Sequence, residues 1–358
     1  MDLKPKIISF YLPQFHQISE NDKWWGKGFT EWRNVKNAKP LFKNHYQPRK
    51  PYNDKYYNLL NPESIKWQTE IAKKYNVYGF CFYHYWFKGR KILEKPAEIL
   101  LDHKEIEFPF CFSWANHSWR RSWYGQNNEI LIKQEYGDLS DWLKHIEYLI
   151  PFFKDRRYIK KNNKPVFLIF KPNDIKNIDA ILQVWQKKLI QEGFGGIHIV
   201  ETLIESQVRP ISSLSEGVTF YEPSYTLFNE NKIRRYRLLA EKYVFKQIIN
   251  KFDYNKIYNE IIKRNNEYNG KKIYFSSFVD YDDTARKKYR IRTFTKANPE
   301  NFKNNFNMLY KKAKEKFSDY IFITAWNEWS EGAYLEPDTK YKYKYLEAIK
   351  EVVNEKII

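Results

Sequence analysis

Short runs of apolar residues recur along the chain, and most are followed by an aromatic or polar cluster and then by a stretch with helical spacing. Runs of this length that are rich in β-branched and aromatic residues are typical of buried strands. The predicted strands are Lys6–Tyr11, Val77–Tyr83, Phe108–Trp114, Pro165–Lys171, Gly196–Thr202, Gly217–Tyr221, Lys272–Phe278 and Tyr320–Trp326. Alternation of these strands with helices predicts parallel pairing in an α/β fold, a (β/α)8 TIM barrel whose site lies at the C-terminal strand ends.

The segments between the strands carry helix signals. Asn61 is a candidate N-cap and Pro62 suits the first helical position, so a helix is predicted from Pro62 to Tyr75. A second helix, Leu139–Phe153, follows Asp138 and repeats apolar residues at helical spacing.

Two connections are longer than a barrel requires. Residues 13–61, after the first strand, are rich in Trp, Lys and Pro, and we expect this long loop to fold over the mouth of the barrel. Residues 229–269 predict a long, basic helical insertion between the sixth and seventh strands. Because no low-complexity tract or linker interrupts the alternation, residues 1–358 are predicted to form one domain.

The charge is strongly positive, with 62 Lys and Arg against 43 Asp and Glu, a net +19. Such a field attracts nucleic acid, anionic lipid or acidic polysaccharide. The lysines are scattered over many segments, however, which favours a solvated surface. We therefore expect no nucleic-acid partner, and peripheral contact with a membrane stays open.

The cysteines and the N-terminal residues indicate in which cellular compartment the protein is expected. Cys81 and Cys111 each lie in an apolar run, as expected of small buried residues in a reducing environment. No metal site and no cofactor are predicted. The chain starts without an apolar signal core, and no run approaches the ~20 apolar residues that span a bilayer. We expect a soluble, cytoplasmic protein, and the oligomeric state is unresolved.

Polar and aromatic residues follow most of the predicted strands. In a barrel these positions face a common pocket. The predicted contacts with substrate are Tyr11, Gln14, His16, Trp32, Tyr83, His84, Tyr85, Trp114, Asn116, His117, Tyr221, Glu222, Arg286, Trp326, Asn327 and Trp329. Such residues suit a polyhydroxylated ligand, because sugar hydroxyls donate and accept while the ring faces stack on aromatic groups. No glycine-rich loop that would hold a pyrophosphate is present.

The last strand runs directly into two carboxylates, Glu328 and Glu331, between tryptophans. Hydrolysis of a glycosidic bond uses one protonated carboxyl and one ionised carboxylate, and these two residues are the predicted catalytic pair. A retaining pair normally has carboxyls about 5–5.5 Å apart. Two glutamates in one loop make a different geometry, so residue type alone does not establish the mechanism.

Several long blocks of the chain resemble the WbsX family of polysaccharide-locus proteins, which is related to glycoside hydrolase family 99, the endo-α-mannosidases and endo-α-mannanases. The blocks are Phe10–His16, Trp24–Trp32, Tyr83–Phe87, Trp114–Asn116, Asp283–Arg286 and Ala325–Asp338. The resemblance implies a retaining reaction in which a base deprotonates the 2-hydroxyl of the sugar, which then attacks C1 to form an epoxide. If the roles of the two family glutamates are carried over to this chain, the resemblance implies that Glu328 is the base and that Glu331 is the acid/base at the glycosidic oxygen.

One block departs from the family pattern. After the third strand the family commonly reads Trp-Ala-Asn-Glu-Asn-Trp, whereas here His117 replaces the glutamate. This change leaves the bound sugar open and could alter the pH dependence of the site.

Each assignment has a structural alternative. Glu328 and Glu331 could form an ion pair or begin a helix, and His84 and His117 could be buried polar residues. Arg286 could anchor either glutamate or pair with Asp282. The tryptophans of residues 24–32 could pack a lid.

The sequence therefore predicts a retaining, endo-acting glycoside hydrolase for a bacterial surface polysaccharide or its lipid-linked precursor. A glycosyltransferase or transglycosidase in O-antigen or capsule biosynthesis is the first alternative, and a non-catalytic glycan-binding barrel is the second. The sugar, its linkage, and endo or exo action are not determined by the sequence.

Overall fold

The computed structural model describes residues 4–120, 129–204, 211–230, 249–264, 270–287 and 290–355, together with residues 234, 236, 238, 240 and 268. Eight parallel strands form a closed ring in which β1 pairs with both β2 and β14, so the predicted (β/α)8 barrel is confirmed. The ring consists of β1 (Lys6–Tyr11), β2 (Gly79–Phe87), β4 (Phe110–Trp114), β8 (Lys164–Ile169), β9 (His198–Leu203), β10 (Gly217–Phe220), β12 (Lys272–Phe278) and β14 (Tyr320–Thr324).

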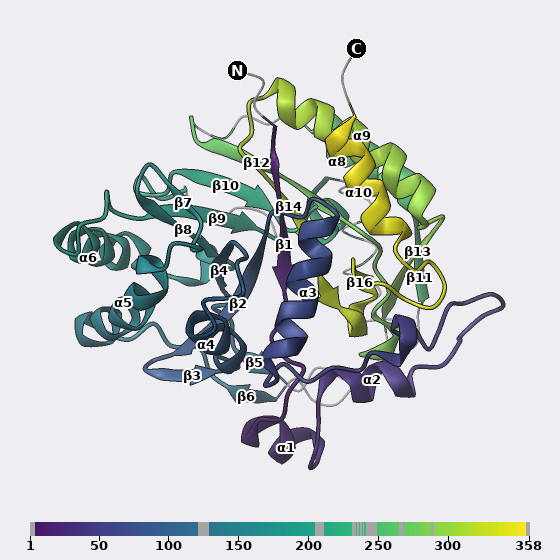
Figure 1. Ribbon diagram of the computed structural model, residues 1–358, viewed down its shortest axis with the longest axis horizontal. Coiled ribbons are helices and arrows are strands. Elements are labelled where there is room, and N and C mark those ends of the chain that lie inside the picture. Colours follow the sequence, from purple (N-terminus) through teal and green to yellow (C-terminus); the bar gives the residue numbers. More distant parts are fainter. Residues whose placement is uncertain are drawn as a thin grey trace.

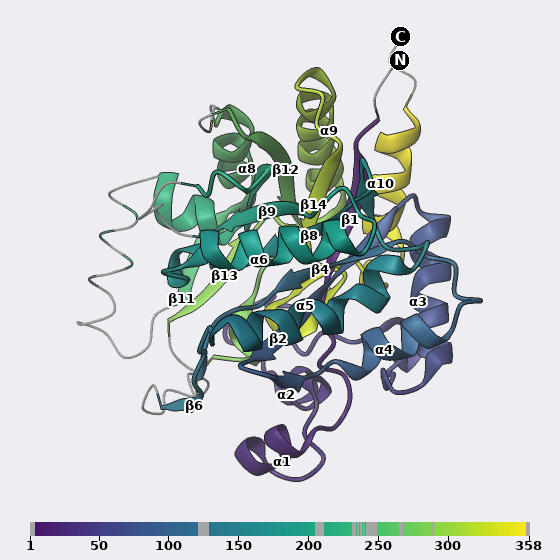
Figure 2. The same ribbon diagram turned by 90° about the vertical axis from the view of Figure 1, so that its left-hand side faces the viewer.

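Helices cover the outside of the ring (Figures 1 and 2). They are α3 (Pro62–Lys74), α4 (Lys95–Asp102), α5 (Leu139–Lys154), α6 (Ile178–Gln191), α8 (Tyr254–Lys263), α9 (Pro299–Glu315) and α10 (Lys344–Asn354). Two predicted starts are confirmed, because the side chain of Asn61 accepts from the N–H of Glu63 and that of Asp138 accepts from the N–H of Asp141. Both caps satisfy N–H groups that the first turn leaves without a helical partner.

Aromatic rings fill the inside of the barrel. The ring of Phe10 stacks on Tyr83 at 5.6 Å between centroids and also packs against Tyr221 and Phe322. Because successive side chains of a strand point to opposite faces, the neighbouring residue Tyr11 points outward, toward Gln68 of α3. This alternation decides which of the predicted residues reach the interior.

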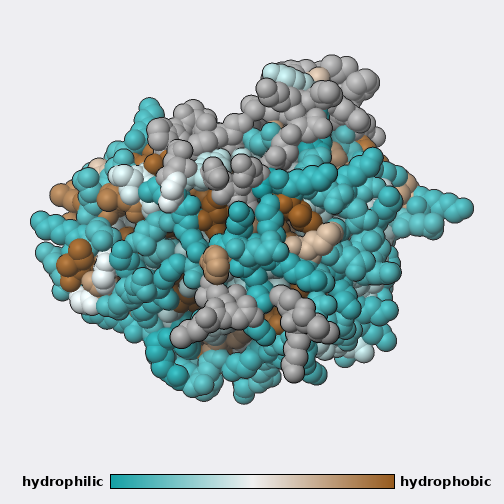
Figure 3. Space-filling view, turned by 90° about the horizontal axis from the view of Figure 1, so that it is seen from above, coloured by the Kyte–Doolittle hydropathy of each residue, from teal (hydrophilic) through white to brown (hydrophobic). Residues whose placement is uncertain are grey.

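The long segment after β1 lies at the opposite end of the molecule from the two termini (Figures 1 and 2). It contains α1 (Ser19–Trp25), α2 (Glu31–Asn37) and the 3-10 turn η1 (Tyr52–Asp54). The terminal end, seen in Figure 3, presents mainly hydrophilic residues around scattered hydrophobic ones. Residues 21, 25 and 31 of the long segment after β1 line the cavity at the mouth of the barrel, so this segment covers one side of the mouth.

The insertion before β12 differs from the prediction. Its described part contains α8, but it also contains β11 (Ile249–Asp253), which pairs in parallel with β13 (Ile291–Thr295). The backbone N–H and C=O groups of β11 are paired by β13, a strand that comes later in the chain, so the residue pattern of the insertion itself could not predict this strand. The segment is thus not helical throughout, and residues 231–233, 241–248 and 265–267 of it lie outside the described residues.

Small elements complete the fold. They are β3 (Arg90–Ile92), β5 (Trp119–Arg120), β6 (Ile130–Ile132), β7 (Lys160–Lys161), β15 (Asn327–Glu328), β16 (Ala333–Tyr334), and the turns η3 (Pro172–Asp174), η4 (Thr226–Glu230), η5 (Asp283–Ala285) and η6 (Trp329–Glu331). Cys81 and Cys111 lie opposite each other on β2 and β4 as buried free thiols. Within the described ranges, no helix combines the length and apolar character needed to cross a bilayer.

Candidate active site

A cavity of about 530 Å³ opens at the C-terminal ends of the barrel strands. Its lining includes eight of the predicted site residues, which are Gln14, Tyr83, Tyr85, His117, Tyr221, Arg286, Glu328 and Glu331. They come from the ends of six different strands, which the closed ring brings together. The two glutamates that were expected to act together thus face the same cavity.

Glu328 lies deep in this cavity and is only 5% exposed. Its Oε1 accepts hydrogen bonds from the hydroxyls of Tyr83 at 2.7 Å and Tyr221 at 3.3 Å, and the two hydroxyls lie 2.9 Å apart. Burial, reinforced by the charge of Glu331, raises the pKa of Glu328 to about 8. In the unliganded site Glu328 is therefore mainly protonated at neutral pH.

Glu331 lies at the end of η6 and forms an ion pair with Arg286. Burial opposes the charge of Arg286, but the carboxylates of Glu331 and Glu31 outweigh it and raise the pKa of the guanidinium above its usual value. The turn ends at Gly332, whose φ of 62° is in the left-handed region, and the N–H of Asp282 donates to the carbonyl of Glu331 at 2.6 Å. The orientation of Glu331 is thus fixed through both its backbone and its side chain.

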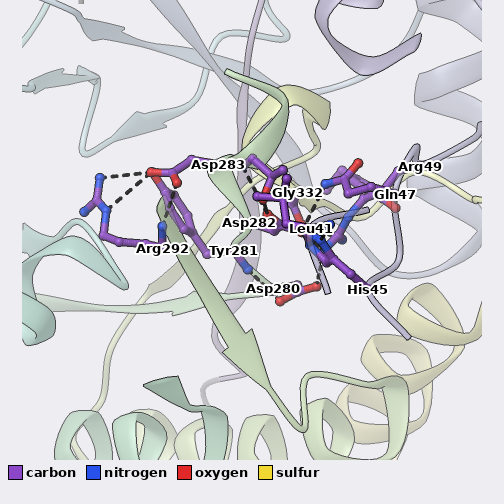
Figure 4. A network of polar contacts seen from close by, with 12 residues as sticks. Leu41, His45, Gln47, Arg49, Asp280, Tyr281, Asp282, Asp283, Arg292 and Gly332 are labelled. Carbon is purple, nitrogen blue, oxygen red and sulfur yellow. Dashed lines mark hydrogen bonds and ion pairs between the residues drawn. The ribbon is translucent and has the colours of Figure 1, made fainter. Parts of the chain in front are cut away.

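A buried polar network supports this turn from behind (Figure 4). Oδ2 of Asp282 accepts from His45 at 2.8 Å and from Gln47 at 3.0 Å. Arg49 pairs with Asp280 at 2.8 Å and donates to the carbonyl of Gly332 at 3.1 Å. Burial would raise the pKa of Asp282, but the hydrogen bond from His45 and the charge of Arg49 lower it to about 2. The network joins the segment over the mouth to the end of β12.

His117 lines the cavity beside Lys171, but it does not act as a cation there. Burial, together with the charges of Lys171 and Arg286, lowers the pKa of His117 to about 4. The side chain is therefore neutral at physiological pH. It can donate or accept a hydrogen bond, and it replaces a charged group of the family pattern by an uncharged one.

Three predicted contacts point away from the cavity, because their neighbours on the same strand take the inward positions. The hydroxyl of Tyr11 donates to Gln68 at 2.7 Å, and Nε2 of His84 lies 2.8 Å from Nε2 of His145 on α5. The ring of Trp114 packs on His145 at 4.8 Å. Tyr11, His84 and Trp114 thus lie outside the lining of the cavity.

Three further predicted contacts are held in structural hydrogen bonds. The side chain of Asn327 bridges the N–H and C=O of Leu12 at 2.7 and 3.0 Å, and that of Asn116 does the same for Lys171 at 2.7 Å for both. Glu222 is buried and paired with Arg264 at 2.7 Å. The two asparagines tie neighbouring strand ends together, and Glu222 joins the end of β10 to the C-terminus of α8. All three lie outside the lining of the cavity.

Four further aromatic candidates do not line the cavity. Trp329, in η6, stacks on Tyr334 at 3.8 Å and donates to Glu336, and Trp32 packs against it at 5.5 Å. Trp326, which packs on Phe80 at 4.9 Å, and His16 are also buried. Trp32 and Trp329 thus support the turn that carries Glu331.

Sequence reasoning missed several residues that line the cavity. They are Asn21, Trp25, Glu31, Trp119, Arg120, Phe170, Lys171, Asp174, Ser224, Tyr281 and Arg292, with Leu12, Ala115, Ser118 and Leu131. Lys171 is the last residue of a predicted strand and Tyr281 follows another, so position alone could have identified them. Glu31 comes from the segment over the mouth, whose path no strand pattern predicts. Across the described ranges, no group of three or more His, Cys, Asp or Glu residues is placed to hold a metal ion.

Several solved structures share this fold. The endo-α-mannosidase of glycoside hydrolase family 99 from Bacteroides thetaiotaomicron, in complex with bis-tris propane, superposes with a TM-score of 0.58 at 17% identity, covering 98% of this chain and 97% of that one. A structure described as a glycoside hydrolase-like protein gives a TM-score of 0.63 at 13% identity, covering 99% and 95%. Fold and cavity together define a barrel of the kind found in glycoside hydrolases.

The sequence identifies the family. The chain belongs to the family described as Glycosyltransferase WbsX, whose model matches residues 7–349. It is also 30% identical over 98% of its length to the uncharacterized protein WxcX of Xanthomonas campestris pv. campestris, in strains B100 and ATCC 33913. The chain spans about half the length of these relatives.

Proposed function

We propose that this protein is a retaining glycoside hydrolase that cleaves a bacterial surface polysaccharide or its precursor. The observation that carries the proposal is the placement of Glu328 and Glu331 in one cavity, with their carboxyls electrostatically coupled. Their environments differ: Glu328 is held by two tyrosine hydroxyls and Glu331 by a guanidinium. Two carboxyls with different environments can divide acid and base work between them.

In the proposed reaction Glu328 takes the proton of the 2-hydroxyl while that oxygen attacks C1, and Glu331 protonates the leaving glycosidic oxygen. Water then opens the epoxide at C1, with Glu331 taking its proton and Glu328 returning a proton to O2. The unliganded site favours the proton on Glu328. The proposed reaction therefore requires Glu328 to give up its proton when a glycan is bound, which is possible because the two carboxyls interact.

The substrate class to test first is the α-mannosides, because the family 99 neighbour is an endo-α-mannosidase. Endo action is supported by the open cavity. Trp25 of the covering segment and Trp119 of the β5–β6 ribbon both line it. Transfer to a sugar acceptor is the second candidate, because the family description is that of a glycosyltransferase. Hydrolysis and transfer use the same epoxide intermediate. Water opens it in hydrolysis, and a sugar hydroxyl opens it in transfer.

The deciding experiment compares Glu331→Gln and Glu328→Gln with the wild type on α-manno-oligosaccharides and on surface polysaccharides, followed by product analysis with and without an added acceptor. We expect Glu331→Gln to lose at least about 100-fold in turnover and to retain glycan affinity. An aryl glycoside with a good leaving group should restore turnover to Glu331→Gln and not to Glu328→Gln. Full turnover by both variants would rule out the proposal, as would products that are exclusively longer than the substrate.

A further inference from the structure

A carboxyl outside the proposed catalytic pair lies in the cavity, contributed by the segment that covers the mouth. Glu31 is the first residue of α2, and its side chain lines the cavity although the residue is only 1% exposed. The hydroxyl of Ser330 donates to Oε2 of Glu31. Ser330 lies between Glu328 and Glu331 in sequence, so this bond joins the covering segment to the turn of the proposed catalytic pair.

The other oxygen of Glu31, Oε1, is buried, and no residue that the structure describes lies in hydrogen-bonding geometry to it. Burial and the charge of Glu331 raise the pKa of Glu31, while the charge of Arg286, the bond from Ser330 and the neighbouring side chain of Asn34 act in the opposite direction. A buried carboxylate oxygen without a well-placed donor destabilises a protein. A hydroxyl of a glycan bound in the cavity can supply that donor.

A role as the N-cap of α2 does not explain why a glutamate occupies position 31. The N-cap of α2 is Thr30, and no side chain caps the helix there. A purely structural bond to Ser330 uses a single acceptor and would be served equally well by an amide oxygen. Arg286 and the start of α2 account for the charge of Glu31. The second oxygen is what a structural role leaves unexplained.

The backbone around Glu31 is held in place before any ligand binds. The N–H of Glu31 donates to the carbonyl of Gln14 at 3.3 Å, and the following residue, Trp32, is wedged between Phe15 and Trp329. Arg33 donates to the carbonyls of Trp25 and Lys27 at 2.8 and 2.7 Å. Such a support fixes the carboxyl relative to the η6 turn, which is what orientation of a substrate requires.

We propose that Glu31 is a substrate-positioning residue, whose Oε1 accepts a hydroxyl of the sugar ring next to the bond that Glu328 and Glu331 cleave. This inference rests on the proposed function and adds a third carboxyl to it. A carboxylate accepts more strongly than a neutral oxygen and cannot donate, so this subsite requires a free hydroxyl on the ligand and disfavours a methylated or acylated one. Glu31 transfers no proton in the reaction.

The test uses Glu31→Gln, which retains the size of the side chain and an oxygen for Ser330. Affinity is measured by calorimetry in the Glu331→Gln background with an α-mannotriose, or with the best-cleaved oligosaccharide if another is preferred. We expect binding to weaken roughly 10- to 100-fold, the range for a hydrogen bond to a charged group. In the otherwise wild-type enzyme, KM should rise more than kcat falls, the pattern of lost ground-state binding.

Thermal unfolding provides a readout that needs no glycan. Because the fold disfavours the charged form of Glu31, Glu31→Gln should melt at or above the wild-type temperature near pH 7, whereas Ser330→Ala should melt below it. Glu20→Gln, on the exposed side of α1 and paired with Arg90, is the matched control and should change neither affinity nor melting.

Two results would overturn the role of Glu31: unchanged affinity in Glu31→Gln, or melting well below the wild type. Failure of the proposed function is a separate result. It is shown by full turnover in Glu331→Gln, whatever the outcome for Glu31.

Discussion

The hydroxyl of Tyr83 donates to Oε1 of Glu328 across 2.7 Å, and both side chains are almost completely enclosed by the barrel. The bond favours the charged form of Glu328, while burial and Glu331 favour the neutral form. Tyr83 therefore influences how readily Glu328 can serve as a base.

Tyr83→Phe removes this bond without changing the shape of the ring. If ionised Glu328 is the base, activity rises with pH as Glu328 loses its proton, and loss of the bond raises the pKa of Glu328 further. We expect the rising limb of kcat/KM against pH to move upward by about one pH unit. Tyr158→Phe, which loses a buried bond to the carbonyl of Val166 far from the cavity, should leave the profile in place.

The raised pKa of Glu328 also predicts how stability depends on pH. A carboxyl whose folded pKa lies above its unfolded value stabilises the fold below the unfolded value near 4.5, and this contribution is lost as the pH rises through about 8. Glu328→Gln stays neutral throughout. We expect the variant to match the wild type at pH 5 and to exceed it by about 1–3 kcal/mol at pH 8.5 in urea unfolding. Glu355→Gln, at an exposed position, should show no such crossover.

Gly332 tests how tightly the η6 turn is packed. A Cβ at this position would lie 2.9 Å from Cζ of Arg49 and 3.0 Å from the backbone nitrogen of Asp282, at a φ that disfavours other residues. We expect Gly332→Ala to cost roughly 2–4 kcal/mol in unfolding free energy and to reduce turnover. Gly270→Ala has a similar φ of 73° with nothing within 4 Å, and should cost about 1 kcal/mol. Equal costs would show that the network around Arg49 yields to the added methyl.

Asn327 distinguishes support of the site from contact with the ligand. Its side chain bonds both the N–H and the C=O of Leu12, so Asn327→Ala should cost about 2–4 kcal/mol of stability and lower kcat. Affinity for glycan in the Glu331→Gln background should stay within about threefold, in contrast to Glu31→Gln. A large loss of affinity with unchanged melting would restore Asn327 as a substrate contact.

The order and approximate bounds of the barrel strands could be predicted because each is an apolar run of typical length, and β1 and β12 match the prediction residue for residue. The site was harder to predict. β2 extends to Phe87, beyond the predicted end at Tyr83. Tyr85 thus points inward and His84 outward, an alternation that depends on where the strand continues. Glu31 could not be assigned, because the path of a long connection is set by tertiary packing rather than by local pattern.

The closure of the barrel has a consequence for synthesis of the protein. β1 is made first, but one of its edges is paired only by β14, which starts at Tyr320. Until that strand leaves the ribosome, the growing chain carries two unpaired strand edges, and such edges promote association between chains. Fragments that end before Tyr320 should therefore aggregate, and the cavity can form only after β14 has been translated.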